Sequence, residues 1–125
     1  MQLYKIYFVY IFTKMTLEKK LQKILFLINQ EKYKELIPKI HELLKEKYQS
    51  IPLYGNLGLS YLKLNKNYLA IKYFLKVKKI DKNNINANHN LGLAYSKINE
   101  IDKAINFYDQ ALEAIKEYPF FFITL

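Results

Sequence analysis

The strongest constraint on this sequence is a repeat with a period of 34 residues. When the sequence is shifted by 34, residues 51–84 fall on residues 85–118, and 11 of the 34 pairs are identical. The best-preserved stretch is NLGLSY at residues 56–61, which returns as NLGLAY at residues 90–95. A period of this length is typical of stacked helical units, because each unit buries its apolar face only against its neighbours. The repeat therefore predicts an all-α solenoid.

Small residues recur at two places in each copy. Gly58 and Gly92 are expected to lie mid-helix, where glycine costs about 1 kcal/mol relative to alanine. We interpret this cost as a sign that a neighbouring backbone comes near. Ala70 and Ala104 supply a matching small site on the second helix of each copy. Large aromatic side chains are expected to fill the remaining space. These are Tyr61, Phe74, Tyr95 and Tyr108.

These residues resemble the tetratricopeptide repeat, whose pattern is W-x2-L-G-x2-Y, then A-x3-F, then P, at a period of 34. The matching residues are Tyr54, Leu57, Gly58, Tyr61, Ala70 and Phe74 in one copy, and Leu91, Gly92, Tyr95, Ala104, Tyr108 and Ala111 in the next. Asn88 replaces the first aromatic residue, and Lys82 and Lys116 replace the proline. The resemblance implies a right-handed α-solenoid of helix-turn-helix hairpins, with looser stacking at the departures.

The 34-residue register also predicts how the chain is divided. An apolar stripe at helical spacing precedes residue 51, but Ile24 and Leu36 stand where the later copies have glycine and alanine. We therefore expect about three repeats and a partial fourth. The predicted segments are an apolar extension over 1–16, a degenerate hairpin over 17–50, repeats over 51–84 and 85–118, and the start of a truncated repeat over 119–125.

The first segment contains an unbroken apolar run at residues 6–12. The run is too short to cross a bilayer, which needs about 20 residues, so we expect a cytoplasmic protein. Its aromatic and β-branched content favours a strand or an interfacial anchor. The alternative is an upstream extension of the reading frame with Met15 as the natural start. Thr16 favours that alternative, because it is a suitable N-cap for a helix that begins at Leu17.

Turn and cap residues predict the other helix boundaries. Pro38 lies within an apolar stripe and predicts a kink or a late start of the second helix. Ser50 and Pro52 suit the start of the next helix, and Asp102 is expected to cap the last one. The predicted helices after residue 50 cover about 51–64, 68–80, 86–98 and 103–117.

Composition argues against several function classes. The net charge of +9 comes from 20 basic residues that are all lysine. Because bidentate readout of bases and phosphates favours arginine, nucleic acid and membrane are not the expected partners. The chain has no cysteine, so a disulfide or a thiolate metal site is excluded. His41 and His89 lie in different hairpins without a nucleophile or a metal motif, so we expect no catalysis and no cofactor.

The resemblance implies a scaffold whose first helices line a concave groove for a peptide or a partner segment. Asparagines in such a groove could hydrogen-bond a bound backbone, and lysines could attract the carboxylates of an acidic partner. The simpler interpretation is that these are ordinary solvated residues. Helical phase predicts the groove residues Asn56, Leu59, Lys63, His89, Asn90, Leu93 and Lys97.

One subfamily holds chaperone C-termini with a carboxylate clamp. This sequence matches that clamp only at Asn90. Its other positions are occupied by Gly55, Leu59, Phe120 and Thr124. Chaperone-tail binding is therefore not expected.

Two further interpretations remain open. The chain could be a recognition module detached from a larger enzyme, such as a glycosyltransferase or a sulfotransferase. It could also be a lysine-rich binder of nucleic acid or anionic membrane, for which Lys76, Lys78, Lys79 and Lys82 provide a basic cluster. Self-association through the apolar ends is an additional option for the partner.

Overall fold

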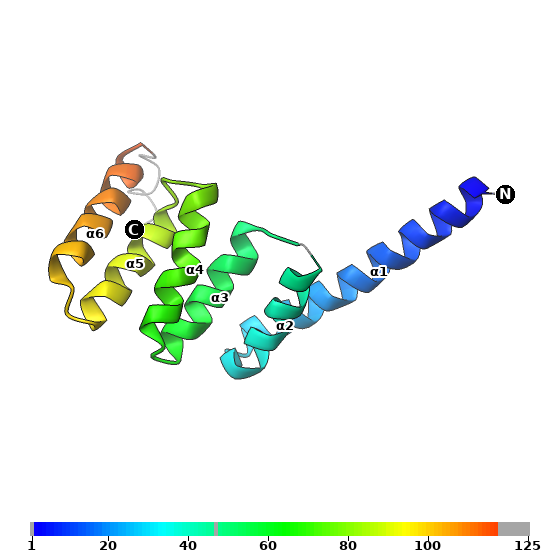
Figure 1. Ribbon diagram of the computed structural model, residues 1–125, viewed down its shortest axis with the longest axis horizontal. Coiled ribbons are helices and arrows are strands. Elements are labelled where there is room, and N and C mark those ends of the chain that lie inside the picture. The colour runs from blue at the N-terminus through cyan, green and yellow to red at the C-terminus, as the bar shows by residue number, and fades with distance from the viewer. Residues whose placement is uncertain (1, 47, 118–125) are drawn as a thin grey trace.

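The computed structural model describes residues 2–46 and 48–117, which form six α-helices and no strand. Consecutive helices pair as hairpins that follow one another along an elongated array (Figure 1). The predicted α-solenoid is confirmed, whereas the predicted repeat over 119–125 lies outside the described residues. The helices are α1 (Gln2–Asn29), α2 (Tyr33–Lys45), α3 (Ile51–Lys63), α4 (Asn67–Ile80), α5 (Ile85–Lys97) and α6 (Ile101–Lys116).

The turn inside each hairpin uses the same backbone conformation. Glu31, Asn65 and Asn99 have φ values of 53°, 61° and 62°. Non-glycine residues rarely adopt this left-handed region, and asparagine tolerates it best. Each is followed by a residue whose N–H donates to the carbonyl five residues earlier, as in a Schellman helix end. The spacing of 34 between these three positions extends the structural period into the hairpin α1–α2.

Two helices that begin a hairpin are capped at equivalent positions. The side chain of Ser50 accepts from the N–H of Leu53 at 3.3 Å, and that of Asn84 accepts from the N–H of Ala87 at 2.9 Å. The prediction that Asp102 caps the last helix is wrong, because α6 begins at Ile101. Asp102 lies in the first turn of α6, where a carboxylate interacts favourably with the helix dipole.

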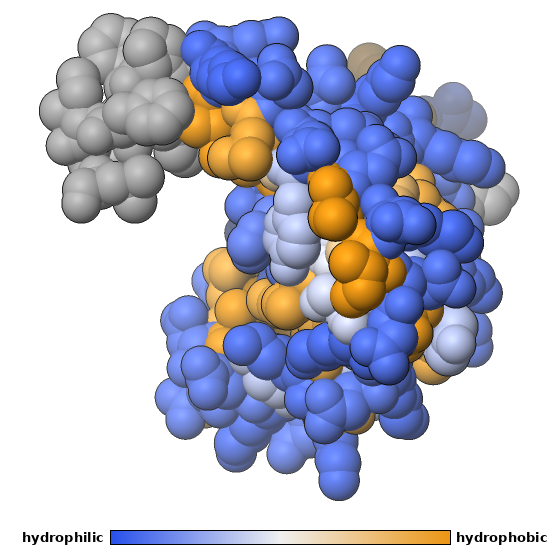
Figure 2. Space-filling view, turned by 90° about the vertical axis from the view of Figure 1, so that its left-hand side faces the viewer, coloured by the Kyte–Doolittle hydropathy of each residue, from blue (hydrophilic) through white to orange (hydrophobic). Residues whose placement is uncertain are grey.

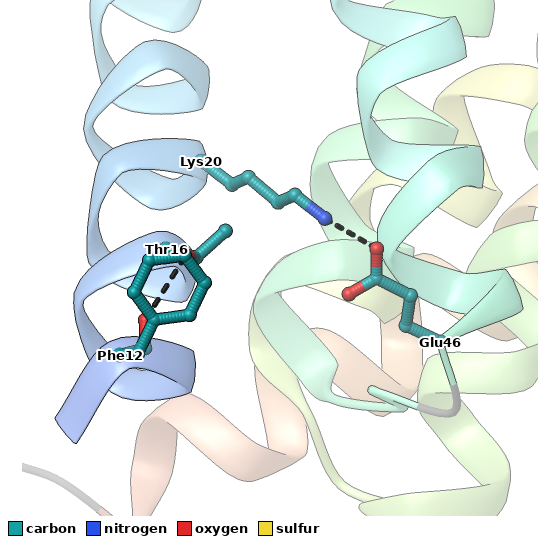
Figure 3. A network of polar contacts seen from close by, with 4 residues as sticks. All are labelled: Phe12, Thr16, Lys20 and Glu46. Atoms are coloured by element: carbon teal, nitrogen blue, oxygen red, sulfur yellow. Dashed lines mark hydrogen bonds and ion pairs between the residues drawn. The ribbon is translucent and has the colours of Figure 1, made fainter. Parts of the chain in front are cut away.

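The N-terminal segment is helical rather than extended. Helix α1 runs without a break from Gln2 to Asn29, so the predicted start at Leu17 and the strand alternative are both wrong. Thr16 caps nothing, because its hydroxyl donates to the carbonyl of Phe12 at 2.9 Å (Figure 3). No glycine or proline interrupts these residues, and the preference of β-branched residues for strands is too weak to end a helix.

Pro38 does not delay the second helix. Helix α2 begins at Tyr33 and contains Pro38, so the predicted late start is wrong. The proline removes the donor for the carbonyl of Lys34, but Pro38 is on the exposed side, where water reaches the backbone. The buried stripe of Leu36, Ile40 and Leu43 keeps the helix intact.

The glycines that recur in the two clear repeats make room for aromatic rings. A Cβ added to Gly58 would lie 3.0 Å from the ring of Phe74, and one added to Gly92 would lie 2.7 Å from the ring of Tyr108. A close approach at both glycines is present, but the prediction that a neighbouring backbone makes it is wrong. The neighbour is a ring from the second helix of the same hairpin rather than a backbone. A side chain at either position would force the facing ring to move.

Candidate functional site

A groove of about 500 Å³ opens between α3 and α5, with α4 at its base. The floor of the groove is apolar, and asparagine side chains also line it. The view from the α6 side shows a mainly hydrophilic surface with hydrophobic residues gathered in the hollow of its outline (Figure 2). The groove is lined by Ile51, Pro52, Gly55, Asn56 and Leu59 of α3, by Phe74 and Val77 of α4, and by Asn84, Asn86, Ala87 and Asn90.

The four asparagines differ in how much of the side-chain amide is free. Asn84 uses its oxygen to cap α5 and its nitrogen to donate to Asp81 at 3.3 Å. Asn56 donates from Nδ2 to the carbonyl of Pro52 at 2.9 Å, which leaves its oxygen as an acceptor. Among the residues that the structure describes, none hydrogen-bonds to the side chain of Asn86 or Asn90. These two retain both a donor and an acceptor for a ligand.

The structure brings three of the seven predicted groove residues together. Asn56, Leu59 and Asn90 line the groove. Lys63 and Lys97 are the last residues of α3 and α5; both are exposed and stand outside the lining.

The other two predicted groove residues contact side chains outside the groove. His89 is exposed, and its ring centroid lies 5.6 Å from that of Tyr108. Leu93 is half-buried and packs against the core. Neither lines the groove between α3 and α5.

Helical phase could have found two lining residues that the sequence analysis missed. Gly55 precedes Leu59 by four residues, and Asn86 precedes Asn90 by the same spacing, so each pair shares one helix face. A Cβ added to Gly55 meets nothing within 4 Å. A larger residue at position 55 would therefore project into open space at the groove.

A polar network joins α4, α5 and α6 behind the groove. The ammonium of Lys78 donates to Asn88 Oδ1 at 2.6 Å, to Gln110 Oε1 at 2.7 Å and to the carbonyl of Lys82 at 3.2 Å. All three acceptors are neutral. Burial, with a smaller effect from Lys82, lowers the pKa of Lys78 below its usual value. Asn88 is fully buried, and its Nδ2 has no partner within the described part of the chain.

An aromatic stack joins α2 to α3 and α4. Tyr73 lies between Tyr61 and Tyr54, with ring centroids 5.7 Å and 6.4 Å away. His41 meets the edge of Tyr73 at 5.8 Å, and its Nε2 lies 3.2 Å from the hydroxyl of Tyr61. Burial, reinforced by Lys45 and Lys72, lowers the pKa of His41. His41 thus belongs to the contact between hairpins.

The comparison with family models decides the identity of the repeats. The model described as tetratricopeptide repeat matches residues 48–117. The chain belongs to the tetratricopeptide repeat family. No curated protein matches the sequence significantly.

Several solved structures share the fold. MamA MSR-1 is 15% identical, with a TM-score of 0.73 over 78% of this chain and 56% of that one. MamA 41-end from Desulfovibrio magneticus RS-1 is 18% identical, with a TM-score of 0.72 over 79% and 56%. The second TPR of Spaghetti (RPAP3) bound to the HSP90 peptide SRMEEVD is 18% identical, with a TM-score of 0.71 over 77% and 84%. The chain thus spans just over half the length of these MamA structures.

Proposed function

We propose that this protein is an interaction scaffold that binds an extended peptide segment of a partner in the groove between α3 and α5. The observation that carries the proposal is an apolar floor flanked by side-chain amides on two equivalent helices. An amide can donate to a peptide carbonyl and accept from a peptide N–H at the same time. Asn56 and Asn90 occupy the same position in successive repeats, which suits a backbone that runs across both.

A related fold provides independent support for a peptide ligand. The second TPR of Spaghetti is bound to the HSP90 peptide SRMEEVD in its solved structure. The present chain carries only one residue of the carboxylate clamp, Asn90, so we do not propose that it binds the same sequence. Lys63 and Lys97 and the net charge of +9 favour an acidic segment, because a positive field attracts it over distance.

The side chains that line the groove favour binding over catalysis. They are aliphatic, aromatic or amide groups, and none is a carboxylate, a histidine or a lysine. Such a surface has no general acid or base to offer at neutral pH. In the described part of the chain, no three histidine, aspartate or glutamate side chains come together as a metal site. We therefore assign no catalytic residue.

The test is selection of binders from a display library of random peptides, followed by titration of labelled binders by fluorescence anisotropy. We expect Gly55→Leu to weaken binding about tenfold or more, because an added Cβ meets nothing within 4 Å and the side chain would extend into the groove. The combined replacement of Asn56, Lys63, Asn90 and Lys97 by alanine should abolish binding while leaving the thermal melt nearly unchanged.

Matched controls separate the groove from general charge effects. Lys66→Ala with Lys103→Ala removes two exposed lysines that do not line the groove, so affinity should change little. The peptide SRMEEVD serves as a probe that should bind weakly. Selected peptides that bind Gly55→Leu as tightly as the wild type would refute the groove proposal.

A further inference from the structure

The first half of α1 stands apart from the helical array (Figure 1). We define residues 2–16 as the N-terminal arm. Eight of its apolar side chains are 59% to 83% exposed. They are Leu3, Tyr4, Ile6, Tyr7, Phe8, Val9, Tyr10 and Phe12.

The exposed apolar residues surround the arm on every side. Residues 6–12 are consecutive and apolar, and each residue of an α-helix is rotated by about 100° from the one before. Seven consecutive residues therefore cover the whole circumference. A protein groove or a facing helix covers only one side of such a helix and leaves the others in water. Lipid chains cover all sides of a helix at once. Helices that are apolar on all sides occur in membranes or in protein cores.

The base of the arm is fixed to the array. Ile24 and Leu27 of the same helix are buried, and α1 packs on α2. The ammonium of Lys20 pairs with the carboxylate of Glu46 (Figure 3). The arm is thus a continuation of a helix that is packed farther along.

Charge around the arm is positive. Lys5 and Lys14 lie within it, and Lys19 and Lys23 are exposed just beyond it. The first acidic residue is Glu18. Tyrosines in the arm have an apolar ring and a polar hydroxyl, which suits the boundary between lipid and water. Lysines beside an apolar helix strengthen its binding to anionic lipids.

We propose that the N-terminal arm inserts into the surface of an anionic phospholipid bilayer and holds the array beside it. The sequence analysis disfavoured a membrane partner because all basic residues are lysine, although an interfacial anchor was one of its interpretations of the N-terminal segment. That inference changes because the arm is an exposed helix with apolar residues on all of its sides. Fifteen helical residues extend about 22 Å, less than the hydrocarbon core of about 30 Å. No helix in residues 2–46 and 48–117 is long and apolar enough to cross a membrane.

The test is flotation of the full chain with vesicles of phosphatidylcholine, with and without phosphatidylserine. We expect the protein to float with the mixed vesicles and much less with phosphatidylcholine alone. The triple variant Ile6→Ser, Phe8→Ser and Phe12→Ser should reduce the bound fraction about tenfold or more. The matched control Ile101→Ser, Ile105→Ser and Leu112→Ser removes apolar side chains that are 51% to 56% exposed elsewhere, and it should float like the wild type.

Charge and depth provide a second measurement. Lys5→Gln, Lys14→Gln and Lys19→Gln should reduce the preference for phosphatidylserine more than Lys66→Gln, Lys79→Gln and Lys82→Gln, which change the net charge equally. The chain has no cysteine, so Tyr7→Cys carries a single fluorophore. Its emission should shift to the blue and be quenched by brominated lipid.

Three outcomes would overturn the proposal. One is flotation of the arm variant at the wild-type level. Another is a concentration-dependent oligomer in analytical ultracentrifugation that the arm variant abolishes while no vesicle binds, which would make a second copy the occupant. The third is retention of the protein by an oligonucleotide but by neither vesicle. Peptide binding in the groove is measured separately, so failure of one proposal leaves the other testable.

Discussion

The hairpins α3–α4 and α5–α6 share one backbone plan but fill an equivalent position with opposite chemistry. In the first, Tyr54 is buried and stacks on Tyr73. In the second, Asn88 is buried at the same repeat position and accepts a hydrogen bond from Lys78. The repeat therefore specifies that this position is buried, but not that it is apolar. A polar residue is accepted because the preceding helix supplies a donor.

The ring that faces each glycine also differs in burial. Phe74, opposite Gly58, is only 2% exposed, whereas Tyr108, opposite Gly92, is half-buried. The hairpin α3–α4 is packed between two others, whereas the hairpin α5–α6 has a neighbouring hairpin on one side only among the described helices. A side chain stabilises in proportion to the apolar area that it removes from water. The same repeat position should therefore contribute more in the interior hairpin.

The largest effect is expected from removing that ring. Phe74→Ala should lower the free energy of unfolding by about 3–5 kcal/mol, the range for aromatic residues deleted from a core. Tyr108→Ala should cost clearly less, because solvent already reaches Tyr108. Urea unfolding followed by circular dichroism measures both. Equal losses would mean that burial does not distinguish the two hairpins.

The next effect concerns the glycines beneath the rings. Gly58→Leu and Gly92→Leu should each destabilise the array by about 1–3 kcal/mol through overpacking. Gly55→Ala is the matched control: it lies in the same helix as Gly58, but its added Cβ meets nothing within 4 Å. It should stabilise α3 by up to about 1 kcal/mol, because alanine is the better helix former. Thermal melts that shift in the same direction for positions 55 and 58 would contradict the packing argument.

A double-mutant cycle tests the polar network of the outer hairpin. Asn88→Leu alone should cost about 1–3 kcal/mol, because it leaves the half-buried ammonium of Lys78 without its nearest acceptor. Lys78→Met with Asn88→Leu should recover much of that loss, since both polar partners are then gone. Additive losses from the two single variants would show that the hydrogen bond contributes nothing.

The smallest effect is a pH dependence of stability that arises from His41 in the aromatic stack. Because the folded pKa of His41 is lowered below 6.5, the unfolded chain takes up the proton first as the pH falls. Stability is therefore complete above pH 6.5 and declines from there down to the folded pKa, below which this loss levels off. His41→Gln should weaken the dependence of the melting temperature on pH between pH 7.5 and 5. His89→Gln serves as the control. An unchanged slope in His41→Gln would remove His41 as the cause.

Local sequence signals were more reliable where the period repeated than where it did not, although the predicted cap at Asp102 failed within a clear repeat. The turns at Asn65 and Asn99 and the cap at Ser50 follow from residue types that suit those conformations. The start of α1 and the effect of Pro38 on the start of α2 could not be predicted in the same way. In both cases a helix continued through a weak local signal.

The groove shows the same division. Three of the residues that helical phase predicted, Asn56, Leu59 and Asn90, are half-buried and line the groove. Lys63 and Leu93 share nearly the same phase but lie outside the lining. Which turns of a helix face a groove depends on the crossing of neighbouring helices, and that crossing is set by contacts between residues far apart in the sequence.

The sequence by itself determined the all-α repeat, its family and the two glycine sites, because a 34-residue period with small and large residues in register has few structural solutions. Only the tertiary structure decided what occupies the space above each glycine, how a buried asparagine finds a lysine donor, and that the arm is an exposed helix. These features depend on side chains brought together from different helices, or on the absence of a packing neighbour among the described helices. The spacing of residues along the sequence predicts neither.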